Sequence, residues 1–345
     1  LLRVSFKRKM KKTMTLIAAL TGVAMANAAN PKHEVLDTLR SYQLQDVQVV
    51  ATRASKKTPM AFTNITQEQI KRLNTGRDIP FLLTTMPSVV TTSDAGNGMG
   101  YTGLRIRGTD ASRINVTANG IPLNDAESSQ LYWVNMGDFA SSLGSIQVQR
   151  GVGTSTNGAG AFGATVNMQT ENIGLQPWAA FDLAGGSYLS HKETVRFSTG
   201  LMGGHWGIQG RLSNLGSKGY VDRASSKLNS YFLQAGYFGE TTVVKFITFN
   251  GVEQTYHAWD FASKYDQEQH GRTYNPSGKM EKDAAGNPQF YKNQNDNYHQ
   301  QHYQLLWNQL LGADWNLNLA LHYTKGDGYY EQYKKNQKLA LYGLD

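Results

Sequence analysis

The histidines are the residues of this chain whose chemistry could hold a metal ion, since its 345 residues include eight histidines and no cysteine. His299 and His302 are spaced so that a β-strand would place them on opposite faces, which argues against a shared metal ion. His257 and His270 fall in a long polar segment, where they either contact a metal or haem ligand or are ordinary surface residues of a loop. No G-x-S-x-G or H-E-x-x-H pattern occurs. The sequence therefore predicts no enzyme, no resident metal and no cofactor.

A glycine-rich segment has the spacing of a nucleotide-binding loop. Gly158, Gly160 and Gly163 fit the G-x-G-x-x-G pattern after a predicted strand, and Asp182 follows about 20 residues later. A dinucleotide site needs a helix after the third glycine, because the N-terminus of that helix binds the phosphates. Residues 165–170 instead alternate with the period of a strand. The sequence therefore argues against a nucleotide site.

The formal net charge of +8 is concentrated at the N-terminus. Six of the 34 basic residues and none of the 26 acidic ones lie in residues 1–28, so the remainder carries 28 basic against 26 acidic residues. Without a basic stripe, a nucleic-acid partner is not expected. The basic run Lys7–Lys12, the apolar stretch Leu16–Ala24 and the site Ala26–Ala28 are the parts of a secretory signal. Because the apolar stretch is shorter than the roughly 20 residues of a spanning helix, residues 1–28 are interpreted as a signal peptide rather than an anchor helix.

Short elements of both kinds follow in residues 58–172. Thr66 and Gln69 offer a capping box for a helix through Leu73, and Asp78 with Pro80 can begin a second helix. Three short strands are expected at 103–107, 115–118 and 146–149, and a Gly/Ser/Thr-rich stretch at 91–103 is expected to be a mobile loop. Asn119-Gly120 predicts a tight turn. The pattern indicates a small α+β domain.

Four motifs in this order carry a family resemblance: Ile106-Arg107-Gly108, Asn119-Gly120-Ile121-Pro122-Leu123, Val148-Gln149-Arg150-Gly151 and Asn157–Ala164. Together they resemble the plug domain of TonB-dependent outer-membrane receptors. Asn119, Val152 and Asn157 depart from the Asp, Pro and Tyr usual in that family. Asn119 tolerates the same left-handed turn as Asp, so this departure costs little.

The resemblance implies roles for several residues of the plug. Structural glycines are expected at Gly108, Gly120, Gly151, Gly158 and Gly163. Arg107 and Arg150 are expected to form ion pairs with acidic residues of an inner barrel wall, where an arginine fork would hold a plug and still be breakable. The alternative is that both are solvated arginines at strand ends.

Residues 29–57 are expected to be a periplasmic lead. Within it, Asp46-Val47-Gln48-Val49-Val50-Ala51 alternates like a short strand near a free end. Such a strand can join a partner's sheet through main-chain hydrogen bonds. The resemblance places the TonB box here, which pairs with the energy-transducing protein TonB, whereas the residues alone fit any first strand.

From residue 173 to 345 the sequence alternates with period two. Trp315, Leu317, Leu319, Leu321 and Tyr323 share one face of the clearest strand, with aromatic residues at its ends. A soluble β-sandwich would alternate as well. Tight connections at 203–204, 239–240 and 312–314 interleave with longer ones at about 185–193, 214–228 and 251–299, the layout of an outer-membrane barrel. We therefore expect an antiparallel transmembrane β-barrel after the plug domain, and a mainly β chain.

The expected number of strands is about seven, whereas plugged transporters use about 22. The chain also ends at Asp345 without the terminal aromatic residue usual in such barrels. We therefore expect an N-terminal fragment. Residues 323–334 are similar to barrel segments of Bacteroidetes-type receptors.

The resemblance implies active import of a scarce ligand across the outer membrane, with TonB and its inner-membrane energising complex as partners and outer-membrane lipid around the barrel. An iron complex, a siderophore or haem, is the expected ligand. Import of a glycan or cobalamin is an alternative, and a passive porin or adhesin with a plug-like domain is an alternative of another class. Polar and aromatic residues of the third long loop are the candidate ligand contacts: Trp259, Tyr265, Arg272, Tyr274, Asn275 and Tyr291.

Overall fold

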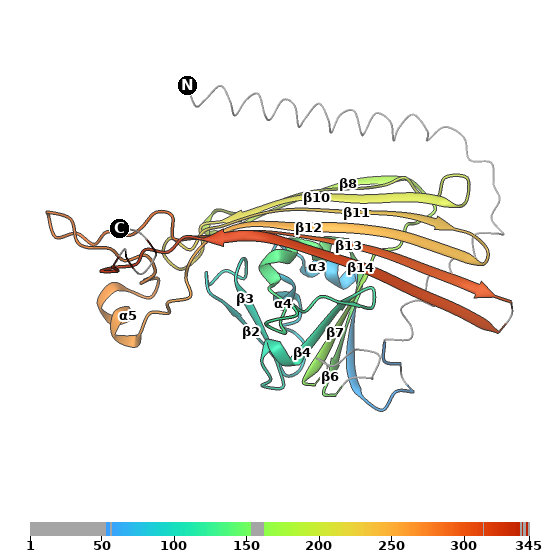
Figure 1. Cartoon of the computed structure of the whole chain (residues 1–345), viewed down its shortest axis with the longest axis horizontal. Coiled ribbons are helices and arrows are strands. Elements are labelled where there is room, and N and C mark those ends of the chain that lie inside the picture. Colours follow the sequence, from blue (N-terminus) through green and yellow to red (C-terminus); the bar gives the residue numbers. More distant parts are fainter. Residues whose placement is uncertain are drawn as a thin grey trace, which may run out of the picture.

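A broad curved sheet lies over a small mixed domain in the computed structural model (Figure 1). The structure describes residues 53–55, 57–152, 162–312 and 314–338, together with 340 and 343. We call the small domain the plug and the seven-stranded sheet the wall. The expected signal peptide at 1–28 and the expected TonB box at 46–51 lie outside the described residues.

The plug is built on a five-stranded sheet of order β1-β6-β7-β4-β5. Its strands are β1 (Ala61–Thr66), β4 (Ile114–Ala118), β5 (Ile121–Pro122), β6 (Leu143–Arg150) and β7 (Ala164–Thr170). Strands β4 and β7 are parallel and the other pairs are antiparallel. The α-helices are α3 (Gln67–Leu73) and α4 (Ile79–Leu82), and the single-turn helices are η1 (Ala111–Arg113), η2 (Trp133–Met136) and η3 (Phe139–Ser142). The expected α+β class of this domain is confirmed, and the segment after Gly163 is a strand.

The two predicted helices begin at the expected residues but not by the same means. The main-chain N–H of Thr66 donates to the Gln69 side chain at 2.9 Å, and the Gln69 N–H donates to the Thr66 hydroxyl at 3.4 Å, which completes the capping box. Asp78 precedes α4 without a side-chain capping bond. Its carboxylate instead accepts a hydrogen bond from the Thr102 hydroxyl at 2.8 Å. Asp78 is thus the N-cap residue of α4, but its carboxylate is taken by a tertiary partner and does not bond the helix.

The segment expected to be a mobile loop at 91–103 is partly a strand. β2 (Val89–Ser93) pairs with β3 (Thr102–Ile106) along its whole length. The residues between these strands form a loop at 94–101, here called the apex loop, in which Ala95 and Met99 are buried. Glycine-rich composition predicted mobility, but contacts with the wall hold this loop.

The wall is antiparallel throughout, in the order β14-β13-β12-β11-β10-β9-β8. Its strands are β8 (Trp178–Gly186), β9 (Ser190–Ser198), β10 (Trp206–Ser217), β11 (Ser226–Phe238), β12 (Thr242–Tyr256), β13 (Asn295–Leu311) and β14 (Trp315–Tyr330). Seven strands, the mainly β content and the antiparallel pairing all agree with the sequence-based expectation.

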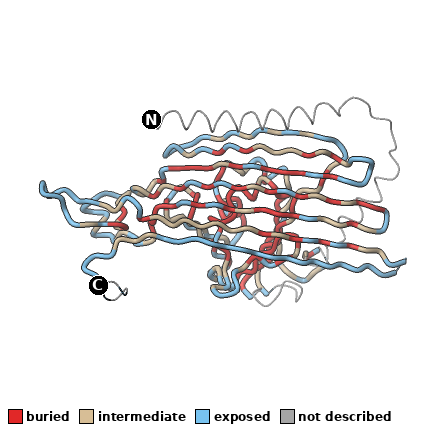
Figure 2. The backbone as a smooth tube through the Cα atoms, turned by 45° about the horizontal axis from the view of Figure 1, so that its top comes forward, coloured by how far each residue is buried: buried red, intermediate tan, exposed pale blue. Residues whose placement is uncertain are grey.

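The wall has its apolar side chains on the outside. On β10, Trp206 and Leu212 are 59% and 53% exposed, whereas Arg211 is 2% exposed and faces the plug. A soluble sheet would bury the apolar face, so this alternation is the one expected where lipid contacts the outside of a barrel. Figure 2 shows buried segments concentrated where the wall and the plug meet. Among the described helices, none has the length and apolar character needed to cross a bilayer.

Connections at the two ends of the wall differ in length, though less than expected. Short turns join β9 to β10, β11 to β12 and β13 to β14. At the opposite end, β12 and β13 are joined by residues 257–294, which include α5 (Lys264–His270) and are here called the outer loop. The expected long connection at 185–193 is wrong, because β8 and β9 extend to Gly186 and Ser190 and leave only η5 (Ser187–Leu189) between them. The one expected at 214–228 is shorter as well, because β10 and β11 leave only residues 218–225 between them.

The hydrophobic core of the plug continues into the inner face of the wall. The Phe139 ring of η3 lies 4.7 Å from the Phe249 ring of β12 and 6.2 Å from the Phe232 ring of β11, measured between centroids. Ile247 and Leu306 of the wall belong to the same buried cluster. The plug is thus packed against the wall by apolar contacts, within which a few charged groups are enclosed.

Candidate functional site

The best-defined polar contact between plug and wall surrounds Asp138. Its side chain is fully buried (0% exposed), with the Lys192 ammonium at 2.8 Å and the Arg211 guanidinium at 3.4 Å. Four neutral side chains also donate to the carboxylate, at 2.6 to 3.1 Å: Asn74, Ser141, Thr194 and Ser213. We call these seven residues the Asp138 cluster.

Strand periodicity positions the wall side of this cluster. Lys192 and Thr194 alternate along β9, and Arg211 and Ser213 alternate along β10, so all four face the plug. Thr194 and Ser213 are directly opposed in the register of the two strands. Asp138 adopts a left-handed conformation (φ 49°) at the start of η3. Asp138 thus lies between η2 and η3, two short helices of the plug that contact the wall.

The electrostatics of the cluster favour an ionised carboxylate. Burial alone would raise the pKa of Asp138, but the charges of Arg211 and Lys192, with the hydrogen bonds from Lys192 and Thr194, hold the pKa below its usual value. A buried charge is stable only when it is paired and hydrogen-bonded. The contact therefore holds the plug firmly while all its members are present.

A second polar contact lies where the plug chain passes into the wall. Glu171 follows β7, and its carboxylate accepts from the Gln209 amide at 3.1 Å and lies 3.9 Å from the Arg196 guanidinium. Gln234 donates to the main-chain carbonyl of Glu171 at 2.7 Å. Arg196 also donates to Asp182 at 2.9 Å, and the Asp182 side chain is 42% exposed. This contact is more open to water than the Asp138 cluster.

The apex loop meets the wall near its outer end. The Tyr101 hydroxyl donates a hydrogen bond to Asp296 of β13, and the Tyr101 ring meets the Trp259 ring edge-on at 5.7 Å. Trp259 in turn stacks on the His257 imidazole at 3.7 Å. Burial, followed by the nearby charge of Glu253, raises the pKa of Tyr101 well above its usual value, so the phenol stays protonated as a donor.

Residues predicted to contact a ligand from the outer loop divide into two groups. Tyr265 is 69% exposed, and Arg272 is exposed as well. Asn275 is 1% exposed and bonds main-chain carbonyls: its amide donates to Asp222 in the β10–β11 connection at 3.0 Å and to His257 of the outer loop at 2.9 Å. Asn275 therefore builds the loop and is not accessible to a ligand in this conformation.

The three remaining predicted contacts are half-buried aromatic residues. Trp259 faces the apex loop as described above. Tyr274 lies between the rings of His270 and Phe290, at 4.5 and 6.5 Å. The Tyr291 hydroxyl donates to Glu331 at 3.3 Å. The structure thus brings Trp259 to the plug and leaves Tyr265, Arg272 and Tyr274 further out on the loop.

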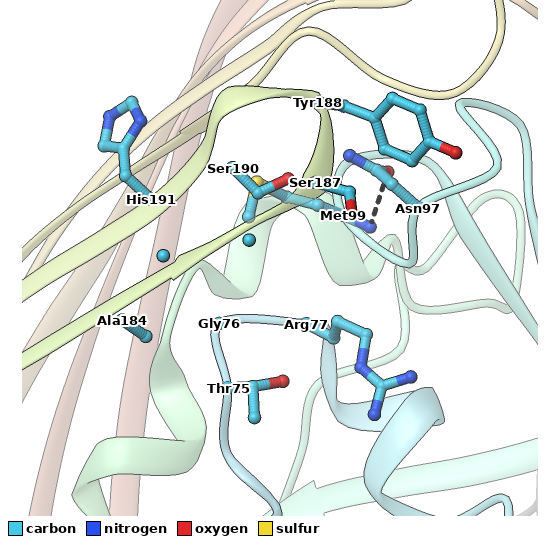
Figure 3. A pocket seen from close by; sticks show the side chains of 12 residues that line it. Thr75, Gly76, Arg77, Asn97, Met99, Ala184, Ser187, Tyr188, Ser190 and His191 are labelled. Atoms are coloured by element: carbon cyan, nitrogen blue, oxygen red, sulfur yellow. Dashed lines mark hydrogen bonds between the residues drawn. The ribbon is translucent and has the colours of Figure 1, made fainter.

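A hollow of about 280 Å³ opens between the plug and the outer end of β8 and β9 (Figure 3). On the plug side it is lined by the segment Thr75–Arg77 and by Asn97 and Met99 of the apex loop. On the wall side it is lined by residues of the β8–β9 hairpin tip: Ala184, Gly185, Gly186, Ser187, Tyr188, Ser190 and His191. A small molecule in this hollow would touch both the plug and the wall.

The two arginines predicted to pair with the wall are placed differently from the Asp138 cluster. Arg150 donates to the Thr63 hydroxyl of β1 at 2.7 Å. Arg107 has a left-handed backbone (φ 53°) and an exposed side chain beside Gly151. Among the described residues neither arginine forms an ion pair. Their pairing with barrel carboxylates stays a prediction.

The expected glycine positions are conformationally demanding where they are described. Gly108, Gly120 and Gly151 have φ angles of 79°, 82° and 103°, and a side chain at Gly163 would collide with Thr109. Gly158 lies outside the described residues. Asn119 does more than turn the chain, because its amide also donates to Gln304 of β13 at 3.2 Å. An Asp at this position could not donate that bond.

The first described residues bind the polar side of the plug sheet. The Ala54 N–H donates to the Gln147 side chain at 2.8 Å, and the Gln147 amide donates back to the Ala54 carbonyl at 3.0 Å. Arg53 donates to Ser145 at 2.9 Å and to the Asn167 carbonyl at 3.2 Å. Arg53 and Ala54, near the end of the expected lead, are therefore fastened to β6 and β7.

No group of three His, Cys, Asp or Glu side chains in the described ranges has the geometry of a metal site. His302 faces the plug and stacks on Phe249 at 4.5 Å, whereas His299 contacts Asn250 on the outer face. The Asp138 cluster itself was missed in the sequence, where Lys192 falls in a segment expected to be a long connection and Arg211 is one polar member of an alternating strand.

The chain is similar to known proteins in sequence over the plug and in fold over most of its length. The family model for the TonB-dependent receptor plug domain matches residues 54–165. No curated protein matches the chain by sequence. Among solved structures, the ferric citrate transporter FecA is 18% identical with a TM-score of 0.61, over 88% of this chain and 44% of that one.

Two further structures are similar in fold. The alcaligin outer-membrane receptor FauA from Bordetella pertussis is 14% identical, with a TM-score of 0.57 over 81% of this chain and 41% of its own. The copper transporter OprC is also 14% identical, with a TM-score of 0.57 over 77% of this chain and 37% of its own. The chain thus spans less than half the length of these proteins, and at these identities the likeness is one of fold.

Proposed function

Residues 54–165 are a plug domain of the TonB-dependent receptor family, and from this premise we propose that the chain belongs to an outer-membrane receptor that imports a scarce ligand with energy delivered by TonB. The observation that carries the proposal is the Asp138 cluster. It fastens the plug to the inner face of a wall whose outer face is apolar. A plug that is held by apolar packing and by a few charged contacts can be released when force breaks those contacts, as a gated importer requires.

Each segment of the chain has a proposed role in transport. Residues 1–28 direct export, residues 29–57 form the periplasmic lead, residues 58–172 form the plug and residues 173–345 belong to the barrel. TonB binds the box Asp46–Ala51. Tension in the lead then reaches β6 and β7 through its residues Arg53 and Ala54, which are bonded to those strands. Force on these strands is transmitted to the plug, which must release the wall for the ligand to pass.

The proposed ligand is an iron complex, taken up at the outer end. Similar structures are described as a ferric citrate transporter, a ferric yersiniabactin uptake receptor and a copper transporter, so iron complexes are represented while the fold allows other cargo. Aromatic and polar groups of the outer loop would provide the first contacts: Trp259, Tyr265, Arg272, Tyr274 and Tyr291. A glycan or cobalamin is the alternative within this class.

Deleting residues 46–51 from the receptor in its native membrane tests the proposal. We expect ligand binding at the cell surface to stay intact while energised uptake is lost, because only the connection to TonB is removed. A matched control replaces the same six residues by a proline-free alternating sequence that keeps strand pairing, which should preserve part of the uptake since the pairing uses main-chain bonds. Unchanged uptake after the deletion would contradict energised transport and favour a passive porin with a plug-like domain. Growth under iron starvation then separates an iron complex from a glycan or cobalamin.

A further inference from the structure

We propose that the hollow between the plug and the tip of the β8–β9 hairpin binds an anionic group of the ligand, a carboxylate or a phosphate, with Arg77 as its cation. This inference rests on the proposed function for its biological setting and names a ligand chemistry for the outer side of the plug. Figure 3 shows Arg77 and Thr75 on the plug side and Ser187, Ser190 and Tyr188 on the hairpin side.

The lining of the hollow is basic. Its twelve residues include Arg77 and His191 and no Asp or Glu. Within the described part of the chain Arg77 has no ion pair. Its guanidinium lies 5.6 Å from the centre of the Phe81 ring, and its stem packs against Gly98. The side chain is exposed, and among the described residues nothing accepts a hydrogen bond from its guanidinium. A planar fork of this kind matches carboxylate and phosphate oxygens.

Hydroxyl groups complete the donor set. Thr75, Ser187, Ser190 and Tyr188 line the hollow and can each donate to an oxyanion. At about 280 Å³ the space is just below the usual range of ligand pockets, which span roughly 300 to 1,000 Å³ for whole small molecules. The hollow thus suits one charged group of a larger ligand.

The hairpin side of the hollow is built with strain. Tyr188 and Leu189 have φ angles of 61° and 53°, a left-handed conformation that costs free energy in residues with side chains. The Tyr188 ring is braced edge-on by Tyr220 at 5.7 Å. Strain of this kind persists only where surrounding contacts enforce it, and it keeps Tyr188 at the rim.

Hydrogen bonds join this side of the hollow to the plug. The Asn97 amide of the apex loop donates to the Ser217 hydroxyl at 2.7 Å, and Ser217 is 2.8 Å from the Ser190 hydroxyl. An anion bound between Arg77 and the hairpin would therefore bridge the plug and the wall where hydrogen bonds already join them.

The hollow also lies next to the Asp138 cluster. A Cβ atom built on Gly76 would be 3.2 Å from the Cβ of Lys192, and the ammonium of Lys192 binds Asp138. An anion in the hollow would therefore lie close to Lys192, whose ammonium fastens the plug through Asp138. This places the anion where it can influence the plug–wall contact.

Calorimetric titration of the purified receptor with citrate and with inorganic phosphate, at low salt and without TonB, tests the proposal. We expect at least one of them to bind, with affinity falling as salt is added, since the contact is ionic. Binding of phosphate without citrate would indicate a phosphate group, and the reverse a carboxylate. Arg77→Gln should weaken binding by about tenfold or more, which is the loss expected for one charge-assisted bidentate contact. The affinity of Arg77→Lys should lie between those of the unaltered receptor and Arg77→Gln, because lysine keeps the charge and loses the planar fork.

Arg72→Gln is the matched control, because Arg72 is an exposed arginine of α3 paired with Glu68 and lies outside the hollow. It should bind as the unaltered receptor does. Absence of binding by both anions at millimolar concentration, or equal affinity for the receptor and Arg77→Gln, would overturn the proposal. Because the titration needs no energy, these results are independent of the uptake assay: anion binding can stand if the 46–51 deletion leaves uptake unchanged, and it can fail while uptake is lost.

Discussion

Removing the charge of Asp138 should loosen the plug more than any other single change at the wall. Asp138→Asn keeps the size of the side chain and leaves Lys192 and Arg211 buried without an anion; they are 4% and 2% exposed. Breaking a buried ion pair by removing one partner costs about 3–5 kcal/mol. With a factor of ten for every 1.4 kcal/mol, the local opening equilibrium should rise by about 10²- to 10³-fold or more.

Hydrogen exchange of the main-chain amides in η3 (Phe139–Ser142) measures this opening. We expect exchange in Asp138→Asn to be faster by that factor, whereas Asp182→Asn should change it by less than about fivefold. The Asp182 side chain is 42% exposed, and an ion pair of this kind contributes about 0–1 kcal/mol. Adding Lys192→Met to Asp138→Asn should restore part of the protection, because one unpaired charge is then removed.

The pH dependence has a defined sign. The pKa of Asp138 is lowered in the folded protein. The ionised carboxylate therefore contributes its full stabilisation of the plug above the unfolded pKa of about 3.9, and this stabilisation is lost only as the pH falls through the lower folded pKa. Equal exchange rates for Asp138→Asn and the unaltered protein at neutral pH would refute the reasoning. Equal effects of Asp138→Asn and Asp182→Asn would refute it as well.

Three further predictions concern the plug surface and the outer loop. Gly251→Ala should weaken plug attachment, because the added methyl group would collide with the Asn135 carbonyl of the plug. Gly174→Ala should not, because its methyl group would enter open space. Thermal unfolding should therefore show a lower midpoint for Gly251→Ala than for Gly174→Ala. Burial raises the pKa of Asp94 to about 6, so stability is lost as the pH rises from the unfolded value of about 3.9 through 6. The apex loop should therefore exchange hydrogen more slowly at pH 5 than at pH 8 after correction for intrinsic rates, and Asp94→Asn should abolish the difference. Asn275→Ala should make the outer loop more sensitive to limited proteolysis, since unsatisfied buried carbonyls cost about 1–3 kcal/mol, and an unchanged cleavage rate would contradict its structural role.

Local signals in the sequence predicted local structure well. The Thr66–Gln69 capping box and the Asn119-Gly120 turn depend on residues a few positions apart, and both are present. The alternation on β10 predicted which side chains face outward, since lipid and plug select opposite polarity on the two faces. The hairpin tip at Tyr188 and Leu189 was missed because neither residue is a usual left-handed turn former.

The contacts that fasten the plug depend on pairings distant in the sequence. Asp138 meets Lys192 and Arg211 only after strand register and plug position are fixed, and each residue alone has no distinguishing pattern. Asp78 has the position of a helix cap and is bound instead by Thr102. Strand ends were misplaced near the outer end because polar residues there occupy both faces, so the alternation no longer separates strand from loop.

A disulfide between plug and wall tests most directly whether the plug must leave the wall during uptake. The chain has no cysteine, and a Cβ built on Gly137 would lie 4.0 Å from the Cβ of Ser230, within the range for a disulfide. In the double variant Gly137→Cys/Ser230→Cys we expect oxidation to abolish energised uptake, ligand binding to persist, and a reductant to restore uptake. Full uptake by the oxidised protein, with the cross-link verified by mass spectrometry, would contradict release of the plug from this part of the wall.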